Sequence, residues 1–267
     1  MDARPGARRR SCNGGRRLDA AVLRFPTPSE SRPQRDRFRP EERRLITRLG
    51  TPLAVQHFLN RLPYNTEPPP VGATLRSFRG VVGHGAAHCL EAALFAAVVL
   101  EQHGYPPLVL SFESIDQLDH VIFVYRRRGL WGSVARSRDP GLHGRRPVFA
   151  RPLTLARSYV DPYVDYTGRV TGYAVVDLRV LGTYDWRLAE TNVWKVERTL
   201  LEYPHRPIVT SDRRFERLRA RYAAYRAAHE GQKPLFYRGR ERWTEIPEEF
   251  LTRPGQTSRG RSRGTAA

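Results

Sequence analysis

The chain has 267 residues, with 46 Lys and Arg against 27 Asp and Glu, so its formal net charge is +19. This length is sufficient for one domain with a full hydrophobic core. No apolar run approaches the roughly 18 residues of a membrane span, so we expect no integral membrane protein. The two cysteines, Cys12 and Cys89, lie too far apart for a disulfide framework. The N-terminal residues lack the apolar region of a secretory signal, and we therefore expect a cytoplasmic protein.

The excess positive charge is concentrated at the two ends of the chain. Residues 1–39 hold eleven arginines against four acids, or +7, and residues 252–267 hold four arginines and no acid, or +4. Both ends are rich in Gly, Pro and Ser, a composition that favours disorder. We expect two disordered basic tails, 1–39 and 252–267, around a single domain at 40–251. The tails could also bind nucleic acid, but solvated tails are the favoured interpretation.

The first half of the domain has helical patterns. Pro40–Leu49 has a proline in its first turn and two early glutamates, and Thr51 is the expected N-cap of a helix that ends near Leu62. Three prolines place residues 67–71 in a loop. The alanine-rich segment Ala86–His103, followed by Gly104, predicts the most buried helix of the chain.

The second half alternates with the period of a strand and then returns to helices. We expect a short strand at 108–112, a hairpin of strands at 118–125 and 130–135, and a loop at 139–151. A short helix at 154–160, a strand at 172–178 and helices within 191–201 and at 212–230 follow. These elements predict an α+β fold with an antiparallel sheet.

Cys89 and His120 form the pair of residues most suited to chemistry. Cys89 lies at the start of the alanine-rich helix, where amide hydrogens favour a thiolate. His120 lies in the next expected strand pair and could act as the acid and base for a cysteine nucleophile. A third group usually orients the imidazole, and the candidates after the next strand are Ser137 and Asp139.

Around these residues the sequence resembles the transglutaminase-like, papain-related cysteine enzymes of bacteria. The resemblance rests on AHCLEAA at 87–93 and LDHVIFVYRRRGLWGSVARSRD at 118–139, and covers roughly residues 45–140. It implies a helix packed on an antiparallel sheet and hydrolysis or acyl transfer at an amide through a thioester. It places the nucleophile at Cys89, the acid/base at His120 and the orienting acid at Asp139. The family usually has this acid nearer the tryptophan, where Ala135 stands, so Ser137 remains an alternative.

The resemblance implies a peptide or protein amide substrate and no cofactor. Other interpretations remain open. A zinc site could use His84, His88, Cys89 and His120, and Asp116 and Asp119 could bind a cationic substrate or raise the pKa of His120. The aromatic residues Tyr159, Tyr163, Tyr166 and Trp194 could stack on nucleic acid, although packing is the simpler role. An inactive binding module is a further alternative, and the oligomeric state is not predicted.

Overall fold

The structure is a computed structural model that describes residues 32–68, 72–117, 119–230 and 232–251. The elements fall into an N-terminal group of helices, a central group of strands with one helix, and a C-terminal group of helices. Their bounds are α2 (Pro40–Arg48), α3 (Pro52–Arg61), α4 (Phe78–His84), α5 (Cys89–Glu101), β1 (Leu108–Ser114), β2 (Val121–Arg127), β3 (Leu130–Val134), β4 (Arg145–Phe149), α6 (Pro152–Tyr163), β5 (Val170–Asp177), α7 (Trp194–Glu202), β6 (Arg206–Pro207) and α8 (Asp212–Ala228).

The strands form one antiparallel sheet in the order β4-β3-β2-β1-β5-β6. The expected hairpin joins β2 and β3 through Arg128 and Gly129, which have φ angles of 53° and 79°. Positive φ at both positions is the geometry of a type I′ turn, whose twist matches that of the paired strands. The α+β class predicted from the sequence is therefore observed.

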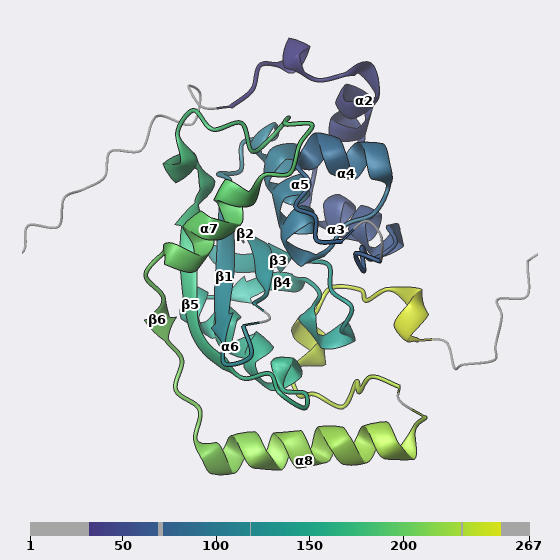
Figure 1. Ribbon diagram of the computed structural model, residues 1–267, viewed down its shortest axis with the longest axis vertical. Helices are drawn as coiled ribbons and strands as arrows, with labels where there is room; N and C mark the ends of the chain where they lie inside the picture. Colours follow the sequence, from purple (N-terminus) through teal and green to yellow (C-terminus); the bar gives the residue numbers. More distant parts are fainter. Residues whose placement is uncertain (1–31, 69–71, 118, 231, 252–267) are drawn as a thin grey trace, which may run out of the picture.

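The sheet is buried on both faces. Successive residues of β2 point to opposite sides of the sheet, so each face has its own set of side chains. Val121, Phe123 and Tyr125 face the core that contains α5, whereas Ile122 and Val124 face the core that contains α6. Nearly every residue of α5 is buried. Figure 1 shows the sheet between these helices, with α3 and α4 beside α5 and with α8 lying across one end. The alternation in the sequence correctly separated the two faces of β2.

Several expected boundaries require correction. The segment 139–151 is not only a loop, because residues Arg145–Phe149 pair with β3 as strand β4. The helix expected at 86–103 is shorter, beginning at Cys89 and ending at Glu101. The helix expected at 154–160 runs from Pro152 to Tyr163, past Pro162. Helix α4 was not expected, since two glycines weaken its helical pattern.

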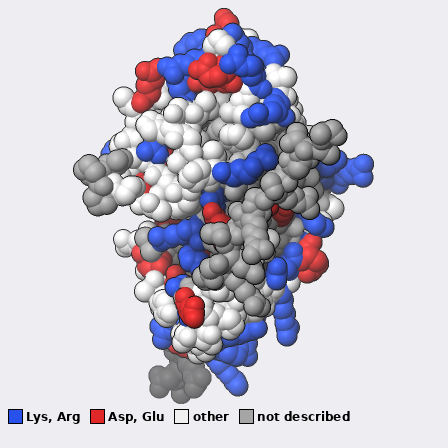
Figure 2. All heavy atoms as spheres, turned by 90° about the vertical axis from the view of Figure 1, so that its right-hand side faces the viewer, with Lys and Arg blue, Asp and Glu red and all other residues white. Residues whose placement is uncertain are grey.

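Residues 1–31 and 252–267 of the two expected tails lie outside the described residues, and so do residues 69–71 of the proline-rich loop. Residues 32–39 are described, and Phe38 is buried in the core against Phe78, so the first tail was expected to extend too far. Within the described part of the chain, no helix has both the length and the apolar character that a bilayer crossing requires. Figure 2 shows Lys and Arg side chains in several groups on one face of the molecule, with fewer acidic side chains among them.

Candidate active site

Cys89 is the first residue of α5, and the residues around it fix the start of that helix. His88 is the N-cap, and its Nδ1 accepts a hydrogen bond from the backbone N–H of Leu90 at 3.2 Å. The Glu91 carboxylate accepts in return from the backbone N–H of His88 at 3.0 Å. This reciprocal cap satisfies two helix-end donors and holds Cys89 at a fixed position beside the positive end of the helix dipole.

Glu91 is fully buried and also fastens the neighbouring loop to the helix. Its carboxylate accepts hydrogen bonds from the Thr74 hydroxyl, the Asn65 amide and the backbone N–H of Arg76, at 3.0, 3.1 and 2.9 Å. Burial by itself raises the pKa of Glu91, but the charge of His88 and these donors lower it below its ordinary value. The carboxylate is thus ionised, and it organises the segment that faces Cys89.

The Cys89 thiol is half-buried, forms no disulfide, and has a pKa well below its ordinary value. Burial by itself raises this pKa, but hydrogen bonds and charge interactions with His120 and His88 outweigh that effect. The N-terminus of a helix favours the thiolate further. The lowered pKa therefore increases the share of the thiolate, which is the reactive form of the nucleophile.

We expect alkylation of Cys89 by iodoacetamide to persist at pH values where an ordinary thiol no longer reacts. A thiol with a pKa of about 8.5 loses roughly tenfold in rate per pH unit below that value, whereas a lowered pKa moves this loss to lower pH. The measurement is the pH profile of alkylation by mass spectrometry, and the control is His120→Ala, which should move the profile toward higher pH. A profile that matches a free thiol in the parent would contradict the lowered pKa.

His120 lies one residue before β2, not within it as expected, and its side chain is buried. Its backbone carbonyl still accepts from Phe112 of β1 at 2.9 Å, which anchors the residue to the sheet. The imidazole stacks on Phe112 at 6.1 Å between ring centroids and contacts Tyr159 at 6.2 Å. Strand pairing and aromatic packing thus fix the plane of the ring.

The two ring nitrogens of His120 have different partners. Nε2 lies 3.0 Å from the backbone carbonyl of Leu142, and the ring also hydrogen-bonds to the Cys89 thiol. A carbonyl can only accept, so Nε2 carries a hydrogen, and Nδ1 is the ring nitrogen that is left for the thiol. The structure therefore brings Cys89 and His120 together, with Nδ1 able to exchange a proton with the thiol.

The structure does not place the Asp139 carboxylate on His120, which is a correction to the expected triad geometry. Asp139 forms an ion pair with Lys233 at 2.7 Å. The Ser137 hydroxyl accepts from the backbone N–H of Asp139 at 3.1 Å, so it is also turned elsewhere. Leu142 supplies the contact instead, because the 3-10 turn Pro140–Leu142 carries its carbonyl back toward the imidazole.

We expect Asp139→Ala to change the turnover of an amide substrate by less than about fivefold, since partly exposed ion pairs contribute about 1 kcal/mol or less. The matched control is Lys233→Met, which removes the same ion pair and leaves the carboxylate. Comparable kcat values for the parent and both variants would agree with orientation by the Leu142 carbonyl. A loss of about 100-fold in Asp139→Ala alone would return the orienting role to this carboxylate.

Arg145 is a residue that the sequence did not single out, and it fixes the turn that holds Leu142. Its guanidinium is fully buried and donates to the carbonyls of Gly141 and His143, on either side of Leu142, at 2.6 and 2.7 Å. The rings of Tyr159 and Trp243 lie 3.9 and 4.7 Å from it. Burial lowers the pKa of Arg145 to about 10, so it stays cationic at neutral pH.

Tyr64 is a second residue that the sequence did not single out. The backbone N–H and the carbonyl of Ala87 each form a hydrogen bond of 3.2 Å to the segment around Tyr64. These bonds join that segment to the chain before α5. The Tyr64 hydroxyl hydrogen-bonds to the backbone of Cys89, and Arg136 lies 5.8 Å from the centre of the ring. The hydroxyl and the Cys89 N–H thus lie together beside the thiol.

A cavity of about 470 Å³ opens over Cys89 and His120. Its wall combines residues from the loop before α5, the loops that follow β1 and β3, and helices α6, α7 and α8. These residues include Tyr64, Glu67, Thr74, His88, Asp116, Asp119, Ser137, Arg138, Asp139, Leu142, Tyr163, Asp165, Trp194, Glu197, Leu201 and Tyr222. The volume is in the range of small-molecule and peptide side-chain sites.

The other predicted ligand and stacking groups are dispersed. Within the described ranges, no three His, Cys, Asp or Glu side chains are positioned to hold a metal ion. His84 is exposed and contacts the carbonyl of Gly80 at 2.9 Å. Tyr159 and Tyr163 are buried in the core beneath the sheet, whereas Tyr166 and Trp194 are exposed. The four aromatic residues therefore do not form one stacking surface.

Comparisons with known proteins give little similarity. No family model matches the chain, and no curated protein matches it. Among solved structures, Legionella pneumophila LapG and its EGTA-treated form have 14% sequence identity, with TM-scores of 0.31 and 0.30. Each match covers 50% of this chain and 73% or 74% of the LapG chain. At these TM-scores the matches carry no argument about the function of this chain.

Proposed function

We propose that the protein is a thiol-dependent amide hydrolase or acyltransferase with a transglutaminase-like core. The observation that carries this proposal is the hydrogen-bonded pair of Cys89 and His120 at the N-terminus of α5, inside a cavity large enough for a substrate. A lone buried cysteine would be a packing residue, but a cysteine with a lowered pKa and a fixed imidazole partner is a nucleophile. The proposed substrate is a peptide or protein amide.

The reaction begins with attack of the Cys89 thiolate on the carbonyl carbon of the amide. A carbon–sulfur bond forms and the carbonyl electrons move to oxygen, which gives an anionic tetrahedral intermediate. His120 then donates its Nδ1 proton to the leaving nitrogen, the carbon–nitrogen bond breaks, and a thioester remains on Cys89. Water, or an amine for acyl transfer, loses a proton to Nδ1 as it attacks the thioester, and the thiolate leaves.

A hydrogen-bond donor beside the sulfur suits the oxyanion of this intermediate. The Cys89 N–H belongs to the first turn of α5, where no carbonyl of the helix can accept from it, and it donates to the Tyr64 oxygen. Burial keeps the pKa of Tyr64 above its ordinary value, so the hydroxyl keeps a hydrogen that it can donate to the oxyanion. A donor fixed in advance at this position stabilises the charge that develops in the transition state.

The test is the detection of a thioester on Cys89. The Cys12→Ser chain, which keeps one thiol, is incubated with peptide amides and quenched in acid, and intact mass is compared before and after hydroxylamine. We expect a hydroxylamine-sensitive acyl adduct that maps to Cys89, together with release of amine, and neither in Cys89→Ala. Amide turnover that is equal in the parent and Cys89→Ala would overturn the proposal.

A further inference from the structure

The cavity over Cys89 has the opposite charge to the protein as a whole. The chain has a net charge of +19, yet six carboxylates line this cavity, against two cationic groups: Arg138 and His88, whose pKa is raised to about 9, against the effect of burial, by its interactions with Cys89. The carboxylates are Glu67, Asp116, Asp119, Asp139, Asp165 and Glu197. A cleft lined by one sign of charge concentrates ligands of the other sign. Negative potential in a strongly basic protein therefore requires a local explanation.

The six carboxylates differ in what they already bind. Asp139 is neutralised by Lys233, and Glu67 accepts from the backbone N–H of Thr74 at 2.7 Å. Asp119 accepts from the Ser114 backbone at 2.9 Å and shapes its own loop. Asp165 accepts from the backbone N–H groups of residues 167 and 168, at 2.9 and 2.7 Å. Asp116 accepts from the hydroxyls of Ser114 and Thr167, at 2.6 and 3.0 Å. These five carboxylates help to build the cavity wall.

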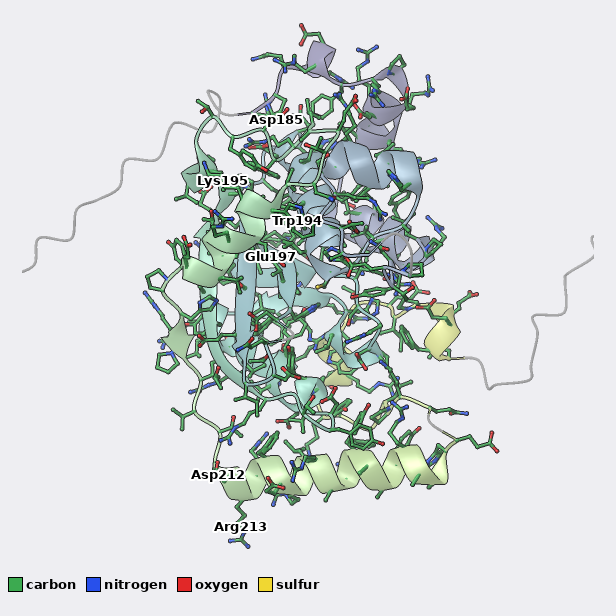
Figure 3. All side chains as sticks on the ribbon, viewed as in Figure 1. Asp185, Trp194, Lys195, Glu197, Asp212 and Arg213 are labelled. Carbon is green, nitrogen blue, oxygen red and sulfur yellow. The ribbon has the colours of Figure 1, made fainter. Side chains whose placement is uncertain are left out.

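Glu197 differs because it stands exposed on α7 between two apolar side chains. Trp194, Glu197 and Leu201 follow one another at the i, i+3, i+7 spacing of a single helix face, and all three line the cavity. Trp194 is 39% and Leu201 62% exposed, so a large apolar surface faces the cavity without a protein partner that covers it. Figure 3 shows Trp194 and Glu197 on the side of α7 toward the centre of the molecule, with Lys195 on the other side.

The neighbouring side of α7 attaches the helix to the domain. Val193, Val196 and Leu200 are buried with the residues of α5, and Leu200 lies at the border between this buried side and the cavity. An exposed indole beside a carboxylate is the combination that recognises a cation with an aliphatic stem, because the ring face attracts the charge and the carboxylate pairs with it. Leu201 extends the apolar contact along the stem.

We propose that the α7 wall, defined as Trp194, Glu197 and Leu201, binds a lysine or arginine side chain of the substrate. This inference rests on the proposed function, since it assigns the substrate class of the same cavity. The stem of the basic residue lies on Trp194 and Leu201, and its charged end meets Glu197. The negative potential of the cavity attracts such peptides and disfavours acidic ones.

The experiment compares three alkylating reagents that share one electrophile: the chloroacetyl derivatives of lysine amide, norleucine amide and glutamate amide. In each case the Cys89 thiolate forms a carbon–sulfur bond and chloride leaves. Rates are measured by intact mass in the full-length Cys12→Ser chain. We expect the lysine reagent to react about tenfold faster than the norleucine reagent at low concentration, and the glutamate reagent to be slowest.

Two charge-matched variants localise the effect. Glu197→Gln should reduce the lysine-to-norleucine ratio by about three- to fivefold, whereas Glu202→Gln, an equal change on the same helix outside the cavity, should leave it unchanged. Equal rates for the three reagents, or equal ratios in both variants, would overturn the inference. Alkylation does not need amide cleavage, so a lysine preference without any turnover would overturn the proposed function and leave this inference standing.

Discussion

Replacement of His120 by alanine is expected to lower amide turnover by about 1000-fold or more. The imidazole both stabilises the Cys89 thiolate and supplies the proton for the leaving amine, so its removal affects two consecutive requirements of the reaction. The measurement is kcat/KM on a peptide amide that the parent cleaves. Cys89→Ser should lose at least as much, because a hydroxyl is a far weaker nucleophile than a thiolate.

The control for this prediction is His84→Ala. His84 is a histidine on α4 that is exposed and does not line the cavity, and its replacement should leave kcat/KM within about twofold of the parent. Circular dichroism and thermal unfolding of His120→Ala should show a folded protein, so that the loss can be assigned to chemistry. Retention of more than about a tenth of the parent activity in His120→Ala would contradict the Cys89–His120 mechanism.

The sequence predicted the helix and the strand that position Cys89 and His120 better than it predicted the contact that orients the His120 ring. The alanine-rich run with Cys89 at its start, and the alternation from Val121 to Tyr125, report strong local preferences that tertiary packing does not reverse. They predict a cysteine at a helix terminus and a histidine at the sheet, close enough to meet. The structure places these two side chains in hydrogen-bond contact.

The orienting contact could not be predicted, because it uses a backbone group. The carbonyl of Leu142 leaves no signal in the sequence, whereas Asp139 offered a familiar side chain, although it lies further from Trp131 than the acid of the family usually does. Strand β4 was also missed, since its sequence RRPVF begins with two arginines and contains a proline. The buried Arg145 in that strand resembles any other arginine of this arginine-rich chain.

Close packing and hydrogen bonds fix loop 141–144 between the sheet and the site. A side chain at Gly144 would come within 2.2 Å of the Gln56 amide oxygen, and one at Gly141 within 2.5 Å of Pro162. The Tyr159 hydroxyl donates to the carbonyl of His143 at 3.0 Å. The backbone here is therefore packed from two sides, and the direction of the Leu142 carbonyl follows from this packing and from the hydrogen bonds that Arg145 and Tyr159 donate to the neighbouring carbonyls.

Arg145→Met is expected to lower the free energy of unfolding by about 3–5 kcal/mol, because it removes a buried charged donor from several backbone acceptors at once. The carbonyl of Gly141 loses this partner in the interior and that of His143 keeps only the Tyr159 hydroxyl, although the methionine chain still fills much of the space between Tyr159 and Trp243. Urea unfolding measures this change. The matched control is Arg146→Met, an exposed neighbour on the same strand, which should change stability by less than about 0.5 kcal/mol. Below the unfolding transition, Arg145→Met should also lower kcat more than it raises KM, because the Leu142 carbonyl no longer fixes the imidazole. Equal unfolding curves for the two variants would show that the buried guanidinium does not hold this turn.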